Sequence, residues 1–136
     1  MAHINAYLSF NGNCKEVMSY YSACLDGELY IQTVGESPMA DKLPPAMKDQ
    51  IMHASITKNG ITLVMGSDMH RDKLVSGNTT TLCVACDSEA QINSFFEKLS
   101  AGGKIVDPLQ KAFWGDTFGV INDKYGRQWM FVYHEA

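Results

Sequence analysis

Residues 113–133 read FWGDTFGVINDKYGRQWMFVY and predict two β-strands joined by a tight turn. The turn is Asp123-Lys-Tyr-Gly126, because Asp at the first position and Gly at the fourth are typical of a type I turn. Alternation along the second strand places Trp129, Phe131 and Tyr133 on one face and Gln128, Met130, Val132 and His134 on the other. Since both faces carry large apolar side chains, we expect both to be covered, one by helices and the other by a cavity or a partner.

Composition limits the classes of function. The 136 residues are 46% hydrophobic, which suits one domain with a sizeable core. A net charge of −4 and scattered Lys and Arg give no basic surface for nucleic acid or an anionic membrane. No apolar run approaches the ~18 residues that span a bilayer, and the N-terminal Met-Ala-His-Ile-Asn does not resemble a secretion signal. We therefore predict a cytoplasmic protein that binds neither nucleic acid nor membrane.

The first half of the chain predicts the element order βαβββ. The expected elements are a strand at 3–11, a helix between Asn13 and Gly27, a strand at 28–35, a loop at 36–49, and hairpin strands at 50–58 and 61–67. Asn13 and Glu16 have the spacing of a capping box, and Gly27 is expected to end the helix. Asn59-Gly60 is a strong signal for the tight turn of a hairpin.

The second half repeats this order after a polar linker at residues 68–77. The expected elements are a strand at 78–86, a helix at 88–101, a strand at 104–109 and the hairpin of residues 113–133. Asp87 or Ser88 is expected to cap the helix, the latter matched by Gln91 three residues on, and Gly102-Gly103 to end it. One domain, residues 1–136, would therefore contain two similar units, residues 3–67 and 78–134.

The four cysteines are expected to be reduced packing residues. Cys83 and Cys86 have the spacing of a redox motif, but they lie on a predicted strand, where residues three apart face opposite ways. Cys14 and Cys86 lie near predicted helix N-termini, where a thiol pKa tends to fall.

Three stretches carry a resemblance to a known family. They are Tyr7-Leu-Ser-Phe-Asn-Gly12 through Tyr20-Tyr21 to Leu25-Asp-Gly27, then Ile51-Met-His-Ala54, and then Trp114-Gly-Asp-Thr-Phe-Gly119 through Asp123-Lys-Tyr-Gly126 to Trp129-Met130. They resemble the glyoxalase, bleomycin-resistance and dioxygenase (vicinal oxygen chelate) superfamily, and within it the PhnB-like branch. The resemblance implies an α+β fold in which two βαβββ units form a curled eight-stranded mixed sheet around a cavity, with helices outside. It also implies that units pair within a chain or across a homodimer.

The superfamily's usual metal site is not expected in this chain. Metal-dependent members use His or Gln in the first strand and Glu in the last strand of each unit. Carried over by resemblance, these positions fall at Ala6 or Tyr7, Val64 or Met65, Thr80 or Thr81, and Met130. None supplies the imidazole or carboxylate that divalent ions commonly require. We therefore predict no metal, and no cofactor of nucleotide type, because no Gly-rich turn follows a strand.

The predicted ligand-binding residues are Tyr7, His53, Met65, Trp114, Asp116 and Met130. Together they describe an apolar cavity with a few polar anchors, which suits a small apolar or aromatic ligand. The other three histidines, His3, His70 and His134, are assigned to solvated surface.

Two of these assignments leave alternatives open. His53 shares a predicted strand face with Ile51, Ser55 and Thr57, and is either an anchor in the cavity or a hydrogen-bonded core residue. Trp114 and Asp116 share a face with Phe118. Either they contact a ligand around which the strand glycines let the sheet curl, or Trp114 packs in an interface and Asp116 pairs with a Lys or Arg.

Two classes of function remain open. The first is a small-molecule binding protein, or an enzyme that works without a metal. The second is an enzyme of the superfamily with an atypical site: a lyase, a dioxygenase, or the demethylubiquinone methyltransferase that relatives are labelled as. The sequence does not decide whether the bound molecule is changed.

Overall fold

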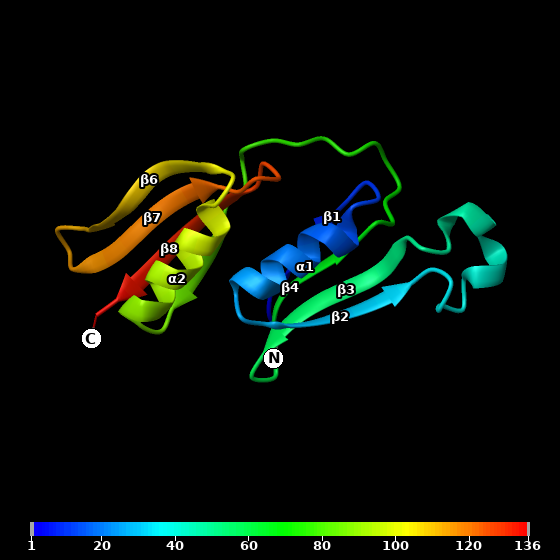
Figure 1. The fold of residues 1–136 in the computed structure, drawn as a ribbon, viewed down its shortest axis with the longest axis horizontal. Helices are drawn as coiled ribbons and strands as arrows, with labels where there is room; N and C mark the ends of the chain where they lie inside the picture. The colour runs from blue at the N-terminus through cyan, green and yellow to red at the C-terminus, as the bar shows by residue number, and fades with distance from the viewer. Residues whose placement is uncertain (1, 136) are drawn as a thin grey trace. The chain divides into compact units, whose positions relative to one another are not determined.

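The computed structural model describes residues 2–135 and divides into two compact units, unit 1 up to Val75 and unit 2 from Ser76. Unit 1 contains β1 (Ala6–Ser9), α1 (Cys14–Cys24), β2 (Glu28–Thr33), the short 3-10 helices η1 (Ala40–Lys42) and η2 (Pro45–Met47), β3 (Ile51–Lys58) and β4 (Ile61–Ser67). Unit 2 contains β5 (Leu82–Cys86), α2 (Glu89–Ser100), β6 (Lys104–Lys111), β7 (Asp116–Asn122) and β8 (Gln128–His134). Figure 1 shows the strands and the helix of each unit.

Both units have the same sheet topology, which confirms the predicted α+β repeat. The strand order is β1-β4-β3-β2 in one sheet and β5-β8-β7-β6 in the other. The first strand of each unit runs parallel to the last, and the remaining pairs are antiparallel. The eight predicted strands are therefore all present, as two four-stranded mixed sheets.

The first strand of each unit is shorter than the sequence predicts. Residues 3–11 yield only Ala6–Ser9, and residues 78–86 yield only Leu82–Cys86. Both are edge strands with a single neighbour, so the ladder with that neighbour sets their length. The alternation of polar and apolar residues extends beyond the paired residues. Residues that have no neighbouring strand to hydrogen-bond with do not form part of the strand.

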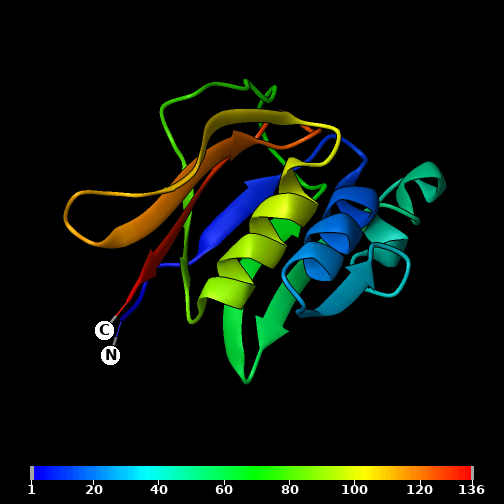
Figure 2. The same ribbon diagram turned by 60° about the vertical axis from the view of Figure 1, so that its left-hand side comes forward.

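Helix α1 covers one face of the first sheet (Figure 2). Its apolar side chains recur at helical spacing, and the buried ones are Cys14, Val17, Met18, Tyr21 and Cys24. Beneath the helix, a Cβ added at Gly66 would lie 2.7 Å from Phe10 and 3.3 Å from Met18, so β4 has no room there for a side chain. The same face of the sheet buries Leu8, Ala54 and Ile56.

The start of α1 is capped by a residue from far along the chain. The predicted cap, Asn13, makes no side-chain capping hydrogen bond. Instead, Asp68 Oδ1 accepts the backbone N–H groups of Gly12 and Cys14, at 3.0 Å each, and Oδ2 accepts that of Ile51 at 2.9 Å. Asp68 is only 5% exposed, so the first residue of the predicted linker is a buried part of unit 1.

The residue that ends α1 also differs from the predicted one. The left-handed residue after the helix is Asp26, with φ of 53°, and not Gly27. Gly27 is required for a different reason, because a Cβ there would lie 2.4 Å from Cγ2 of Ile56. This glycine allows the chain to pass closely over the sheet as it leaves the helix.

Helix α2 packs on the second sheet as the sequence predicts. Ser88 Oγ accepts the backbone N–H of Gln91 at 3.0 Å, which confirms the cap. Phe96 from the helix contacts Phe131 edge-on, with ring centroids 5.8 Å apart. A Cβ at Gly119 would lie 2.6 Å from the Phe96 ring, so this strand glycine accommodates the helix. The close approach at Gly119 is therefore to the helix of its own unit.

The final hairpin is confirmed, but its first strand begins later than predicted. Phe113, Trp114 and Gly115 form the turn between β6 and β7, in which Ala112 N–H donates to Asp116 O at 2.7 Å and Gly115 N–H donates to Ala112 O at 3.0 Å. Gly115 has φ of 100°, a conformation that favours glycine. At the other end of β7, Gly126 N–H donates to Asp123 O at 3.0 Å, as the predicted turn requires.

Candidate functional site

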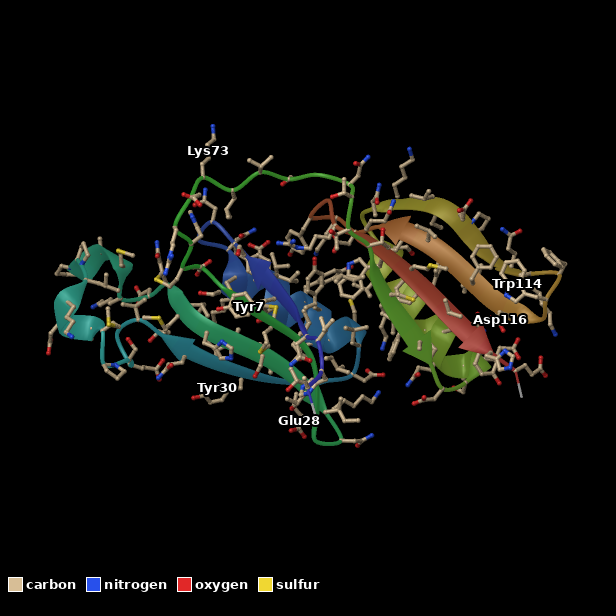
Figure 3. The ribbon with its side chains drawn as sticks, turned by 180° about the vertical axis from the view of Figure 1, so that it is seen from behind. Tyr7, Glu28, Tyr30, Lys73, Trp114 and Asp116 are labelled. Carbon is tan, nitrogen blue, oxygen red and sulfur yellow. The ribbon has the colours of Figure 1, made fainter. Side chains whose placement is uncertain are left out.

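Each sheet has an open face, meaning the face opposite the helix of its own unit. In unit 1 the strand register places Tyr7, Met65, Ser55 and Tyr30 side by side in one row across β1, β4, β3 and β2. Tyr7 is 52% exposed and Tyr30 is 59% exposed, on the two edge strands (Figure 3). The open face of unit 1 therefore carries two tyrosine rings with a methionine and a serine between them.

His53 lies on the same open face, next to this row. It is half-buried and pairs with Gln32 of β2, and its ring centroid lies 6.2 Å from that of Tyr7. The predicted common face with Ile51 is wrong, because Ile51 is 1% exposed and its N–H donates to Asp68. A register shift between the Thr33–Ile51 and Gln32–His53 pairs breaks the alternation of β3 at this point.

The open face of unit 2 contains Met130. Its row across the sheet consists of Cys83, Met130, Val120 and Asp107. Met130 and Val120 are half-buried, whereas Cys83 is exposed. Trp129 and Phe131 are 3% and 0% exposed and lie on the helix side, so the predicted assignment of the β8 residues to two faces is correct.

The pairing of β5 with β8 also changes one of the four positions that were compared with the metal ligands of the relatives: Cys83 takes the place of Thr80 or Thr81. Tyr7 pairs with Met65 in unit 1, and the topologically equivalent pair in unit 2 is Cys83 with Met130. Thr80 and Thr81 lie before β5, and the Thr81 hydroxyl donates to Gln128 Oε1 at 2.6 Å. The four equivalent positions are therefore Tyr7, Met65, Cys83 and Met130, a set without imidazole or carboxylate that does not fit a hard divalent ion. Across residues 2–135, no three His, Cys, Asp or Glu side chains are grouped as a metal site would require.

Trp114, Asp116 and His134 form a hydrogen-bonded cluster at one end of the open face of unit 2. Figure 3 shows Trp114 and Asp116 close together at this end. Trp114 Nε1 donates to Asp116 Oδ2 at 3.0 Å, and His134 Nδ1 bonds Asp116 Oδ1. The hydrogen bond from His134, supported by the one from Trp114, lowers the pKa of the Asp116 carboxyl below its ordinary value. The expected alternative partner of Asp116, a Lys or Arg, is thus replaced by a histidine and an indole.

The six predicted site residues fall into two groups, one in each unit. Tyr7, His53 and Met65 are neighbours on the open face of unit 1, and Trp114 and Asp116 contact each other in unit 2. Met130 shares the open face with Asp116, but it lies four residues before His134 on β8, which is about 13 Å along the strand.

Two members of these faces, Cys83 and His134, are not among the predicted site residues. Alternation along β8 already placed His134 on the face of Met130, which was the available signal. Its position near the end of the chain led instead to an assignment as solvated surface. Cys83 was missed because the strand register was shifted toward Thr80 and Thr81.

Two buried cysteines, Cys14 and Cys86, have thiols that resist ionisation. Burial, and then the negative charge of Asp68, raise the pKa of Cys14 to about 12. Burial, followed by Asp87 and Cys83, raises the pKa of Cys86 to about 11. The expectation that the pKa of these thiols falls is wrong, because burial and the neighbouring negative groups raise both values.

Only one thiol should therefore react readily in the folded protein. We expect Cys83, the exposed cysteine, to react with a disulfide reagent at about pH 8, while Cys14, Cys24 and Cys86 react only after unfolding. The measurement is the absorbance of thiolate released from Ellman's reagent, before and after denaturant is added. Cys83→Ser should abolish the fast phase, and a fast phase that persists in this variant would contradict the assignment.

None of the helices within residues 2–135 is long and apolar enough to cross a bilayer.

Comparison with known proteins relates the whole chain to one family. A family model described as 3-demethylubiquinone-9 3-methyltransferase matches residues 2–132. Protein YjdN from Escherichia coli strain K12 is 33% identical over 136 residues, which cover 93% of this chain and 92% of that protein.

Solved structures agree with this relationship. Protein PA1353 from Pseudomonas aeruginosa is 34% identical, with a TM-score of 0.80 over 100% of both chains. A putative 3-demethylubiquinone-9 3-methyltransferase, PhnB protein, from Bacillus cereus is 29% identical, with a TM-score of 0.74 over 97% of this chain and 99% of that one. A glyoxalase/bleomycin resistance protein/dioxygenase family enzyme from Burkholderia phytofirmans PsJN is 8% identical, with a TM-score of 0.63 over 96% of this chain and 98% of that one, and so shares the fold. The chain therefore belongs to the PhnB-like family described as 3-demethylubiquinone-9 3-methyltransferase and has the glyoxalase/bleomycin resistance fold.

Proposed function

We propose that this protein binds a small, largely apolar or aromatic molecule on the open faces of its sheets. The observation that carries the proposal is the composition of those faces. Each helix covers only one face of its sheet, and the other face presents aromatic, methionine and a few polar side chains. The binding residues are Tyr7, His53 and Met65 in unit 1 and Trp114, Asp116 and Met130 in unit 2. Apolar surfaces with few polar anchors are typical of small-molecule sites.

The proposed binding does not use the metal site of the superfamily. The positions equivalent to its ligands are Tyr7, Met65, Cys83 and Met130, and these favour apolar contact. The methyl transfer named in the family's description is not part of the proposal. Neither sheet is the doubly wound parallel type that binds nucleotide-like cofactors, and within residues 2–135 no Gly-rich turn leads from a strand into a helix.

Substitution of Met130 tests the binding face directly. In Met130→Trp, we expect the larger ring to cover the open face of unit 2 and abolish the fluorescence enhancement of an anilinonaphthalene dye. The substitution should cost no more than about 1–3 kcal/mol, the range for overpacking, because Met130 is only half-buried. The measurement is a dye titration on protein whose circular dichroism shows that it is folded.

A matched control is the same exchange at another half-exposed methionine. Met39 is 39% exposed and precedes η1, outside the strands of its own sheet, so Met39→Trp should leave dye binding unchanged. Unchanged dye binding in folded Met130→Trp would remove Met130, and the face assigned around it, from the proposed site.

We further propose that the protein is a homodimer. A sheet that is covered on one face only leaves apolar surface exposed to water, and pairing of units is the superfamily's way of covering it. A two-fold dimer is also the commonest closed assembly. Sedimentation at micromolar concentration should give twice the chain mass of 15.1 kDa. A species at the chain mass itself would contradict the dimer, because specific interfaces of about 1,600 Å² generally persist at that dilution.

We propose a cytoplasmic location on the basis of the composition. Four free cysteines suit a reducing cytoplasm, and a net charge of −4 does not favour nucleic acid or an anionic membrane as a partner.

A further inference from the structure

His134 is held by a carboxylate on the neighbouring strand. His134 of β8 and Asp116 of β7 are paired across the ladder, and His134 Nδ1 bonds Asp116 Oδ1. The other oxygen of Asp116 accepts the indole N–H of Trp114 at 3.0 Å. Each oxygen of this carboxylate therefore orients one ring, and the imidazole and the indole flank the same acid.

This arrangement selects one tautomer of the imidazole. An ionised carboxylate can only accept a hydrogen bond, so the bonded Nδ1 of His134 carries the hydrogen. Nε2 then has a lone pair, and no group within residues 2–135 donates to it. The side chain is 73% exposed, so Nε2 is accessible to a ligand. A base whose second nitrogen is fixed by a carboxylate is the arrangement required for proton abstraction.

One ionised carboxylate faces the His134 imidazole. The pKa of Asp116 is lowered by the hydrogen bonds from His134 and Trp114, so the carboxylate stays ionised beside the imidazole. Lys111 at the end of β6 and Glu135 after β8 form their own ion pair at 3.1 Å, and their charges cancel. Asp116 is therefore the negative charge in direct contact with the imidazole.

Aromatic rings lie beside this base. Trp114 is 57% exposed and stacks on Phe118, with ring centroids 5.9 Å apart and planes at 17°. Phe113 contacts Trp114 edge-on at 4.9 Å between centroids. A flat ring can rest on such a surface by stacking while a polar substituent reaches the imidazole.

We propose that His134 is a general base that removes a proton from an aromatic ligand bearing a weakly acidic hydroxyl, such as a phenol, with Asp116 as its positioning residue. The proposal rests on the proposed function, because it requires a small aromatic molecule on the open face of unit 2. In the step, the ligand O–H bond breaks and its electron pair stays on oxygen. The proton forms a bond to Nε2, which yields an imidazolium paired with the Asp116 carboxylate. No oxidant or other reactant is needed.

The probe for the test is 4-nitrophenol, because its phenolate absorbs visible light and its neutral form does not. Equilibrium dialysis measures how much probe is bound, and the phenolate band of the bound probe measures its ionisation as pH is varied. For the wild-type protein we expect the ionisation midpoint of the bound probe to fall by about one pH unit or more, as an adjacent cation produces. The methyl ether, 4-nitroanisole, should bind similarly and show no change.

The variants separate the base from its positioning residue. We expect His134→Gln to bind the probe and lose the shift, Asp116→Asn to reduce the shift, and Asp116→Glu to restore part of it. His70→Gln replaces another exposed histidine, one that bonds only the backbone oxygen of Asp72, and should keep the full shift.

The outcomes distinguish this proposal from the proposed function. If wild-type protein binds neither 4-nitrophenol nor 4-nitroanisole, aromatic binding fails and the base assignment fails with it. If both bind but the phenol shows no shift, the binding function stands and the base is refuted. A full shift in folded His134→Gln would assign the proton to another group and would also overturn the proposal.

Discussion

Replacing Asp68 with alanine is expected to lower the free energy of unfolding of unit 1 by about 3–5 kcal/mol. The change removes the acceptor of three backbone N–H groups, those of Gly12, Cys14 and Ile51. Each buried donor left without a partner costs about 1–3 kcal/mol, and those of Cys14 and Ile51 lie in buried surroundings. The same change removes the side chain that links the start of α1 to the start of β3.

Urea unfolding followed by two signals can locate this loss. Far-ultraviolet circular dichroism reports both units, whereas both tryptophans of the chain, Trp114 and Trp129, lie in unit 2. In Asp68→Ala, the loss of dichroism should begin at lower urea than in the wild type. Asp72→Ala removes an exposed carboxylate nearby and should change stability by less than about 0.5 kcal/mol. An Asp68→Ala variant as stable as this control would show that the three hydrogen bonds contribute little.

A loss of similar size, about 3–5 kcal/mol, is expected in unit 2 for Asp123→Ala. Asp123 is 3% exposed, and its Oδ1 accepts the backbone N–H groups of Tyr125 and Arg127 at 2.8 and 3.0 Å. Its Oδ2 accepts the indole N–H of Trp129 at 2.8 Å. Because Trp129 is 3% exposed, loss of this partner leaves a buried donor unsatisfied as well as a weakened turn.

Tryptophan fluorescence measures this effect, since the emission of Trp129 shifts to the red when the ring becomes hydrated. The midpoint of the red shift in urea should fall strongly in Asp123→Ala. Trp129→Phe removes the indole donor and keeps both turn hydrogen bonds, so by circular dichroism it should cost less. The matched control is Asp107→Ala, an exposed aspartate on β6, for which we expect less than about 0.5 kcal/mol. If Asp123→Ala and Asp107→Ala behave alike, the turn network does not stabilise unit 2.

Most of the secondary structure could be predicted because its signals are local. Asn59 and Gly60 both have positive φ, 52° and 78°, as the hairpin turn that their sequence indicates requires. The buried stripe of α2, Ile92, Phe95, Phe96 and Leu99, has helical spacing in the sequence. The two faces of β8 follow from alternation alone, and the repeat follows from two successive βαβββ patterns.

The candidate site was only partly predictable. Met130 and Tyr7 lie on open faces as alternation and the family resemblance indicate. Trp114 was expected within a strand, but it lies in the turn before β7 and reaches Asp116 and Phe118 from there. The position of Trp114 depends on a turn in which Gly115 has a left-handed backbone conformation. The alternating residue types of this stretch predict a strand instead.

The amino-acid sequence by itself determined the element order, the repeat, the hairpin turns at Asn59-Gly60 and Asp123-Lys-Tyr-Gly126, and the two faces of β8, because these depend on residues close together in the chain. Tertiary structure alone decided that Asp68 caps a helix more than fifty residues earlier, that Cys83 stands beside Met130, and that Asp116 holds His134. The physical reason is register. A hydrogen bond between distant segments exists only after strands pair, and a shift of one or two residues in that pairing brings different side chains together.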